Sequence, residues 1–508
     1  MNIASLVERN IRTFGERTSM IYEGRELTNV ALHEESQRLA AALVELGVAA
    51  GDRAAVLLPN SPELVTAYGA ILGMGAVLVP MIFLLAVPEV HLILQEATPK
   101  VLFTSVELVG NVLQAVEGLD RPPKIVVTGD TAPDGTLRYG DLIAGREANF
   151  PVAAKDEGDL AVISFTGGTT GRPKGVMLTH GNLLAEAELV NEIVPNGPED
   201  MGLSVLPMAH LFGMASLFAS QLFGYPAVTL RWFTAEGFIE SVERYRVTMA
   251  AVVPTMLTLV LNHPDFASHD LTSLKKVVCG AAPLPQEISD EFERRTGCTI
   301  LEGYGMTETS AGAVLERMDR PRKKGSCGMA YPQTQLKVVD DDDRELPAGE
   351  TGEVCIKGPM VMAGYYNNLE ATAEALRDGW MHTGDVGRLD EEGYLYITER
   401  KKDLIIRGGF NIYPRDVEEV LYTHPAVAEA AVVGMPSAEL GEEVKAYVVL
   451  KSGAETTEET LIAFCQEVLA KYKTPRAVAF LEALPKSPIG KILKRELREM
   501  ARREAARS

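Results

Sequence analysis

Residues 164–175 read SFTGGTTGRPKG and directly follow the apolar run 160–163. Four glycines, three threonines, one arginine and one lysine occupy these positions. Glycine lets backbone N–H groups converge, threonine hydroxyls add donors, and Lys174 adds a positive charge. The stretch is therefore a candidate phosphate loop, with an ordinary glycine-rich connection as the alternative. The Walker A pattern is excluded, because Pro173 precedes Lys174 and Gly175 follows it.

Short β-rich apolar runs alternate with helical patterns on both sides of this loop. Strands separated by helices favour parallel βαβ sheets that are covered on both faces. From residue 336 the pattern changes to a hairpin with an acidic turn, followed by two short strands, which predicts an antiparallel β subdomain. The parallel strands are expected at 54–58, 76–80, 100–104, 124–128, 160–165, 250–254 and 275–280, and the antiparallel ones within 336–359, 386–389 and 394–397.

A compact α+β pattern follows Arg400. From Arg400 to the end there are 18 basic and 16 acidic residues, about +2, so residues 1–399 carry about −23. A chain of 508 residues is expected to form at least two domains. We predict an α/β protein with a large N-terminal domain, 1–399, and a small α+β C-terminal domain, 400–508. The latter has expected strands at 404–408, 428–435, 443–450 and 478–481, and helices at 414–423, at 458–472 and in the tail after 490.

Composition restricts the partners and the compartment. The net charge of −21 argues against a nucleic-acid binder, because phosphate contacts require clustered Lys and Arg. Five cysteines without a close pair indicate neither a zinc site nor a disulfide framework, which fits a reduced cytosol. Charged residues in the first dozen positions argue against a signal peptide. We therefore expect a cytoplasmic protein.

Residues 64–88 contain no charged side chain, and their number would suffice for a membrane span. Three glycines and Pro80 divide the segment into a short helix, a strand and a loop, which is typical of a buried α/β unit. The apolar residues 81–85 leave two possibilities. Exposed, they would serve lipid delivery at a membrane surface or formation of a homodimer, and buried, they would belong to the core.

The stretch FTGGTTGRPKGV resembles the phosphate loop of the adenylate-forming (ANL) superfamily, which includes acyl-CoA synthetases. Gly167 stands where that family usually has Ser. Each further motif has an ordinary reading by itself, as a loop, a turn or a solvated lysine, but together they follow the family's order and span the chain. They are CGAAPL (279–284), YGMTET (304–309), HTGDVG (382–387), ERKKDLIIRGGFNIYP (399–414) and PKSPIGKILKREL (485–497).

This resemblance implies an AMP-forming acyl-CoA synthetase that uses ATP, CoA and Mg²⁺. A carboxylate attacks the α-phosphate of ATP and expels pyrophosphate, and CoA then displaces AMP from the mixed anhydride. The N-terminal domain would bind AMP, and the C-terminal domain would be mobile, with its hinge at Lys402. Gly408 and Gly409 would line the CoA tunnel.

The resemblance also implies roles for individual residues. Lys491, Thr166, Glu308 and Lys174 form the catalytic set, in which Lys491 bridges the carboxylate and the α-phosphate and Glu308 holds the metal. Tyr304 would stack on adenine, and Asp385 would accept hydrogen bonds from the ribose hydroxyls with help from Arg400. The implied nucleotide-binding set is Thr166, Gly167, Gly168, Thr169, Thr170, Gly171, Lys174, Gly280, Ala281, Ala282, Gly303, Tyr304, Gly305, Met306, Thr307, Asp385, Ile397 and Arg400.

The acyl pocket is expected from 205–218, 251–256 and the loop at Gly303, with His210, Met214 and Val253 in its wall. The first two segments contain no Lys or Arg, which favours an acid with a hydrophobic tail, a medium- or long-chain fatty acid. His210 would gate this channel, or it would be a helix-capping or core histidine. The alternatives are a ligase for aromatic or alicyclic acids, an acyl-AMP ligase that loads a carrier protein, and a non-catalytic nucleotide-binding relative.

Overall fold

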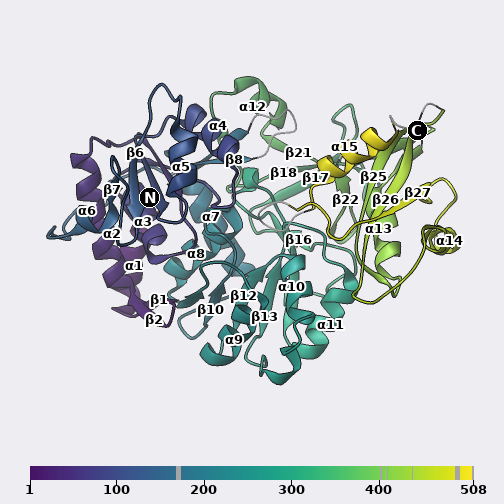
Figure 1. Cartoon of the computed structure of the whole chain (residues 1–508), viewed down its shortest axis with the longest axis horizontal. Coiled ribbons are helices and arrows are strands. Elements are labelled where there is room, and N and C mark those ends of the chain that lie inside the picture. Colours follow the sequence, from purple (N-terminus) through teal and green to yellow (C-terminus); the bar gives the residue numbers. More distant parts are fainter. Residues whose placement is uncertain (167–172, 401–402, 409, 438, 487–491, 506–508) are drawn as a thin grey trace.

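The computed structural model describes residues 1–166, 173–400, 403–408, 410–437, 439–486 and 492–505 (Figure 1). A large N-terminal part, coloured purple to teal in Figure 1, holds two mainly parallel sheets surrounded by helices. The antiparallel strands β17, β18, β21 and β22 lie between it and a smaller C-terminal part, coloured light green to yellow. This arrangement confirms the predicted α/β fold class.

The first sheet carries the glycine-rich stretch at one side. Its order is β19-β9-β8-β4-β3-β5-β6-β7, with β3 to β6 parallel and β9 antiparallel to β8. The five strands expected between 54 and 165 are present, and β9 is an additional strand. The bounds are β3 (Arg53–Leu57), β4 (Val77–Pro80), β5 (Val101–Ser105), β6 (Lys124–Thr128), β7 (Leu137–Arg138), β8 (Leu160–Thr166), β9 (Lys174–Thr179) and β19 (Gly364–Tyr365).

The second sheet has the order β16-β15-β14-β13-β12-β10-β11-β1-β2. The strand expected at 250–254 ends at Val252, because Pro254 begins a helix. The bounds are β1 (Thr18–Tyr22), β2 (Arg25–Thr28), β10 (Gly202–Ser204), β11 (Ala227–Thr229), β12 (Met249–Val252), β13 (Lys276–Cys279), β14 (Thr299–Tyr304), β15 (Val314–Leu315) and β16 (Met329–Ala330).

Helices cover both sheets and bury apolar faces against them. The uncharged segment 64–88 forms most of α3, then β4 and a turn, as predicted, and its last two residues begin α4. Across the described ranges, no helix has the length and apolar character needed to cross a bilayer. The bounds are α1 (Ser5–Phe14), α2 (Asn29–Glu45), α3 (Pro62–Gly73), α4 (Val87–Ala97), α5 (Val109–Val116), α6 (Tyr139–Ile143), α7 (His180–Ile193), α8 (Leu211–Phe223), α9 (Ala235–Tyr245), α10 (Pro254–Leu261), η1 (Phe266–Ser268), α11 (Gln286–Thr296), η2 (Thr307–Thr309) and α12 (Leu369–Ala375).

The predicted antiparallel subdomain is also present. The hairpin expected within 336–359 is the β17–β18 pair. The strands expected at 386–389 and 394–397 correspond to β21 and β22, although β21 begins earlier, at Trp380, and β22 continues to Arg400. Since β21 pairs with β18 and with β22, it connects the hairpin to the last strand before the C-terminal part. The bounds are β17 (Gln335–Val339), β18 (Gly352–Lys357), β20 (Leu376–Arg377), β21 (Trp380–Leu389) and β22 (Leu395–Arg400).

The C-terminal part has its own hydrophobic core, in which Val417 and Leu421 of α13 pack against Val432 and Val448 of the sheet. The helix expected at 458–472 ends at Val468, because the next residue, Leu469, adopts extended backbone angles. The bounds are β23 (Ile405–Arg407), β24 (Phe410–Ile412), α13 (Pro414–Tyr422), β25 (Val427–Ser437), β26 (Gly441–Leu450), α14 (Glu458–Val468), β27 (Ala477–Phe480) and α15 (Lys494–Ala505).

Candidate active site

A cavity of about 1530 Å³ lies between the N-terminal and C-terminal parts. The ends of β4, β8 and β14 reach it from one side, and residues of α13 and α15 line it from the other. Ligands of open parallel sheets bind beyond the carboxyl ends of the strands, where this cavity lies. The predicted site residues on its wall are Thr166, His210, Ala281, Ala282, Gly303, Tyr304, Gly305, Thr307, Asp385 and Ile397.

The glycine-rich stretch connects two neighbouring strands of the first sheet. Thr166 ends β8 and pairs with Lys174, which begins β9, and the Thr166 hydroxyl donates to the Lys174 carbonyl at 3.4 Å. Gly175 is required by close packing, because a Cβ there would lie 2.9 Å from the Ile163 side chain. The predicted residues Gly167, Gly168, Thr169, Thr170 and Gly171 lie outside the described residues.

A second loop, residues 304–312, follows β14. The two ends of this loop approach each other most closely at Gly305, where a Cβ would lie 2.1 Å from the Ala311 carbonyl oxygen. The predicted metal ligand Glu308 lies on η2 and is only 8% exposed. The backbone carbonyl of Glu308 accepts from the Met362 N–H at 2.8 Å, and its carboxylate accepts from the Tyr365 hydroxyl at 2.8 Å. The loop is thus held from one side by the segment that leads into β19.

Tyr365, which the sequence motifs did not include, contacts two of the predicted site residues, Glu308 and Lys174. Its ring also faces Lys174, with the ammonium nitrogen 5.0 Å from the ring centroid. The contact arises because β19 pairs with β9, the strand that Lys174 begins. None of the motifs that we recognised includes residue 365, and only the pairing of β19 with β9 shows its position.

Two residues predicted to bind the nucleoside are in direct contact. The Tyr304 hydroxyl donates to the Asp385 carboxylate at 2.6 Å, and Asp385 is 3% exposed. Asp385 follows an irregularity in the pairing of β21 with β18, where Glu353 accepts from the Gly384 N–H at 3.0 Å. The backbone of Arg400 pairs with Asp385 across β21 and β22. These contacts place an aromatic ring and a carboxylate on one part of the wall.

Buried charges surround the junction of the two parts. The Arg415 guanidinium of α13 donates to the Ile397 carbonyl of β22 at 2.7 Å and pairs with Glu419 at 2.9 Å. Burial raises the pKa of Glu302 to about 7, although Arg415 opposes this shift. Burial also raises the pKa of Glu316 to about 7, and the Glu316 carboxylate accepts from the Glu302 N–H at 2.9 Å.

The residues predicted for the acyl pocket lie in different environments. Met214 and Val253 are buried in two separate hydrophobic cores, and neither belongs to the described lining of the cavity. His210 lines the cavity and also caps α8, because its Nδ1 accepts from the Phe212 N–H at 3.3 Å. Gly280 and Met306, which were predicted to bind the nucleotide, do not line the cavity either.

The apolar segment 81–85 is neither a free patch nor wholly core. Met81 is buried, Ile82 and Leu85 are half-buried, and all three line the cavity. Leu84 does not line the cavity and is 51% exposed. Most of the segment is therefore available to a ligand inside the cavity.

The C-terminal part presents one face of α15, from Lys494 to Arg502, and the two residues before the helix to the cavity. Ile492, Leu493 and Lys494 line it, whereas the β23–β24 hairpin that carries Gly408 does not. On this hairpin Phe410 is 59% exposed and stacks on Tyr472. The predicted residues Lys402, Gly409 and Lys491 lie outside the described residues, as does the side chain of Arg400.

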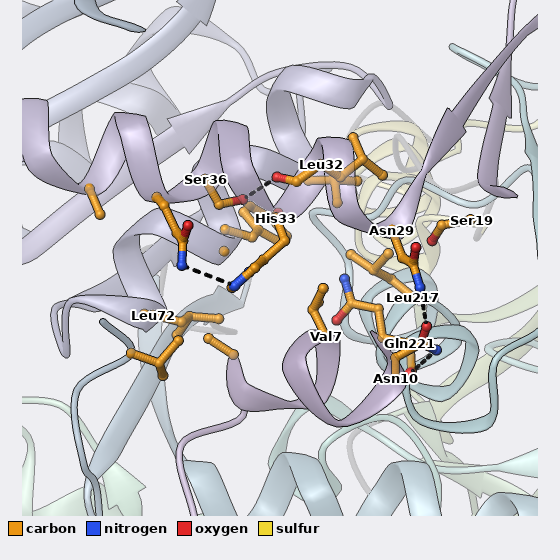
Figure 2. A pocket seen from close by; sticks show the side chains of 18 of the residues that line it. Val7, Asn10, Ser19, Asn29, Leu32, His33, Ser36, Leu72, Leu217 and Gln221 are labelled. Carbon is orange, nitrogen blue, oxygen red and sulfur yellow. Dashed lines mark hydrogen bonds between the residues drawn. The ribbon is translucent and has the colours of Figure 1, made fainter. Parts of the chain in front are cut away.

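A second cavity, of about 40 Å³, lies among α1, α2, α3 and α8 (Figure 2). Its polar groups are largely paired: Asn29 donates to Asn10 at 2.8 Å, and Gln37 lies 3.2 Å from the His33 ring. The volume has room for a few water molecules at most, because one water needs roughly 10–15 Å³. This cavity is therefore too small for a nucleotide, and the larger one is the candidate active site.

Comparisons with known proteins identify the family of the chain. The model of the AMP-binding enzyme family matches residues 7–366, and that of the AMP-binding enzyme C-terminal domain matches residues 416–491. A long-chain-fatty-acid–CoA ligase of Bacillus subtilis is 36% identical, over 98% of this chain and 94% of its own length. A feruloyl-CoA synthase of an Amycolatopsis species is 37% identical, over 96% of this chain and 97% of its own length.

The fold comparison gives the same result. The solved structure of an anthranilate CoA ligase in complex with anthranoyl-AMP has a TM-score of 0.95 and 29% identity, and it covers 100% of this chain and 98% of its own. The large N-terminal part and the small C-terminal part thus both match, in sequence and in structure, enzymes named as CoA ligases. This chain belongs to the AMP-binding enzyme family of the adenylate-forming (ANL) superfamily and is an acid–thiol ligase of the acyl-CoA synthetase type.

Proposed function

We propose that this ligase activates a medium- or long-chain fatty acid through an acyl-adenylate and then forms the CoA thioester, releasing pyrophosphate and AMP. The observation that carries the proposal is the apolar wall, defined as the cavity-lining residues Met81, Ile82, Leu85, Ile93 and Phe165. Four of these residues, all except Ile82, belong to or pack against one hydrophobic core beside the phosphate loop. An alkyl chain placed there would be removed from water, which contributes about 0.8 kcal/mol per methylene.

The charge of the wall supports an acid with one carboxylate. Among the described lining residues numbered 80–258, Glu89 is the one Asp or Glu, and there is no Lys or Arg. A second carboxylate on the substrate would therefore be desolvated there without a cation, at a cost of several kcal/mol. The fatty-acid ligase of Bacillus subtilis has the matching substrate class in its name.

The reacting groups would be held by the two loops. Lys174 and the threonines Thr166, Thr169 and Thr170 would bind the pyrophosphate end of ATP, while Tyr304 and Asp385 would hold adenine and ribose. Lys491 would bridge the attacking carboxylate and the α-phosphate. Because two anions must approach each other, these donors would act mainly by stabilising developing negative charge.

Glu308 is suited to hold Mg²⁺ beside the phosphates. Within the described part of the chain, no group of three or more His, Cys, Asp or Glu side chains could bind a metal by itself. Glu308 is a single buried carboxylate next to Thr307, which would contact the phosphate. This arrangement fits Mg²⁺, which takes its remaining ligands from phosphate oxygens and water. When bound, the ion would neutralise part of the phosphate charge.

The orientation of the C-terminal part suits the first half-reaction. The residues next to Lys491, from Ile492 to Lys494, face the cavity, and the Gly408 hairpin does not. We propose that the domain boundary lies near residue 400 and that a rotation about Lys402 brings Gly408 and Gly409 to the cavity for CoA. The exposed Phe410 would then become covered.

Pyrophosphate release with a panel of acids tests this function. Octanoate, palmitate, ferulate, anthranilate and succinate would each be supplied with ATP, with and without CoA, and thioesters identified by mass spectrometry. The proposal predicts the highest kcat/KM for octanoate or palmitate, with thioester formation. A higher value for ferulate or anthranilate would assign an aromatic-acid ligase, and release without thioester would assign an acyl-AMP ligase.

A further inference from the structure

The side chain of Tyr365 contacts two groups of opposite charge. Its hydroxyl donates to a Glu308 carboxylate oxygen at 2.8 Å, and its ring lies 5.0 Å from the Lys174 ammonium. In the proposed function these groups hold the metal and the phosphates, so this inference rests on it. Tyr365 itself is 7% exposed and packs in the hydrophobic core of the N-terminal part.

We propose that Tyr365 is a positioning residue that keeps Glu308 and Lys174 apart and aimed at the same phosphate. The contacts that Tyr365 makes leave the charges of Glu308 and Lys174 intact. A phenol is a neutral donor, so the Glu308 carboxylate keeps its negative charge and its second oxygen. An aromatic face attracts the Lys174 ammonium through its quadrupole and likewise does not neutralise it.

Without the Tyr365 side chain, the Glu308 carboxylate and the Lys174 ammonium would tend to pair with each other. Within the described residues Lys174 makes no ion pair, so the nearby buried carboxylate is an attractive partner for it. A Glu308–Lys174 pair would withdraw both groups from the metal and the phosphate. An aromatic spacer with a hydroxyl at its end prevents that pairing and still fixes both side chains.

The backbone around Tyr365 is fixed to both loops. The Tyr366 N–H donates to the Gly175 carbonyl at 2.7 Å, and the Ala363 N–H donates to the Met177 carbonyl at 2.9 Å, which anchors β19 to β9. On the other side, the Ser310 hydroxyl donates to the Met360 carbonyl at 2.8 Å. The segment 360–366 therefore joins the phosphate loop to the loop of Glu308, and Tyr365 lies at the junction.

Gly364 is required for this placement. Its φ is +140°, and a Cβ at this position would lie 2.7 Å from the Thr372 side chain. The Thr372 hydroxyl in turn accepts from the Tyr365 N–H at 2.9 Å. Helix α12, which carries Thr372, thus fixes the backbone from which the tyrosine side chain projects.

The test is ATP binding measured by calorimetry without any carboxylic acid, with and without Mg²⁺, in the wild type, Tyr365→Phe and Tyr366→Phe. Tyr366 is the matched control, because it is the neighbouring tyrosine and its hydroxyl has no hydrogen bond among the described residues. We expect Tyr365→Phe to reduce the Mg²⁺-dependent gain in ATP affinity about tenfold, the effect of one hydrogen bond to a charged group. Tyr366→Phe should retain the wild-type gain.

A second pair of variants separates positioning from packing. Glu308→Gln removes the charge, so we expect Tyr365→Phe to have little further effect on the Mg²⁺ dependence in that background. An undiminished Mg²⁺ dependence in Tyr365→Phe, or an equal loss in both backgrounds, would overturn the proposal. Because no acid is present, the result is independent of the acyl substrate: if the wild type binds ATP as described but turns over no fatty acid, the proposed function fails and this inference stands.

Discussion

The hydroxyl of Tyr304 donates to the carboxylate of Asp385 at 2.6 Å, which joins the end of β14 to β21 across the wall of the active-site cavity. The contact orients the carboxylate that we expect to bind the ribose. It also fixes the ring that we expect to cover adenine. One side chain would thus organise both parts of the proposed nucleoside site.

Replacing Tyr304 with Phe keeps the ring and removes this donor. We expect the KM for ATP to rise about tenfold while kcat stays within a few-fold, because a hydrogen bond to a charged group is lost and the reacting atoms are untouched. Initial rates of pyrophosphate release at saturating acid give both constants. An unchanged KM would show that the hydroxyl has no role in nucleotide binding.

Arg415 is expected to stabilise the orientation needed for adenylation, because it donates from α13 to the Ile397 carbonyl of the N-terminal part. Arg415→Ala should slow pyrophosphate release about tenfold and leave thioester formation from a supplied acyl-adenylate unchanged. Arg503→Ala, an exposed position on α15, is the control and should affect neither rate. Equal slowing of both half-reactions by Arg415→Ala would contradict this role.

Stability should depend on pH through Glu316 and Glu302. Burial raises both pKa values from 4.5 to about 7, so each folded-state carboxyl keeps its proton where the unfolded one has lost it. Their contribution is complete below pH 4.5 and is lost as the pH rises toward 7, with a slope of up to about 1.4 kcal/mol per pH unit for each proton.

Urea unfolding between pH 5 and pH 7.5, about the window set by these pKa values, measures that slope. Glu316→Gln keeps an acceptor for the Glu302 N–H and removes one titrating group, so its free energy of unfolding should fall less steeply with pH. Identical slopes in the wild type and the variant would show that Glu316 is ionised in the folded protein.

The apolar wall should determine preference for chain length. Leu85→Ser introduces a hydroxyl into the wall, so we expect kcat/KM for palmitate to fall about tenfold, with a smaller change for a short acid. Leu84→Ser is the matched control, because Leu84 is the exposed neighbour. If Leu84→Ser has the larger effect, the acyl chain enters over the outer surface and not along the wall.

The fold was predictable wherever a strand or helix has its own periodic pattern, such as β3 to β6 or α13. Strand β9 was not, because its apolar residues follow the glycine-rich loop directly and become a strand only by pairing with β8. The motifs located Thr166, Tyr304 and Asp385 on the wall. Met214, which was predicted to line the acyl pocket, lies in the core. Packing of α8 against α1 and α7 decides which face of this helix is buried, and the sequence pattern alone did not show that packing.

Opposite faces of the C-terminal domain would serve the two half-reactions, and Lys491→Ala separates them. Acid-dependent pyrophosphate release should fall by roughly 10²–10³, the usual effect of losing one charge-stabilising group. Thioester formation from synthetic acyl-adenylate and CoA should continue at the wild-type rate. Equal loss of both activities, or full pyrophosphate release without this lysine, would contradict the account.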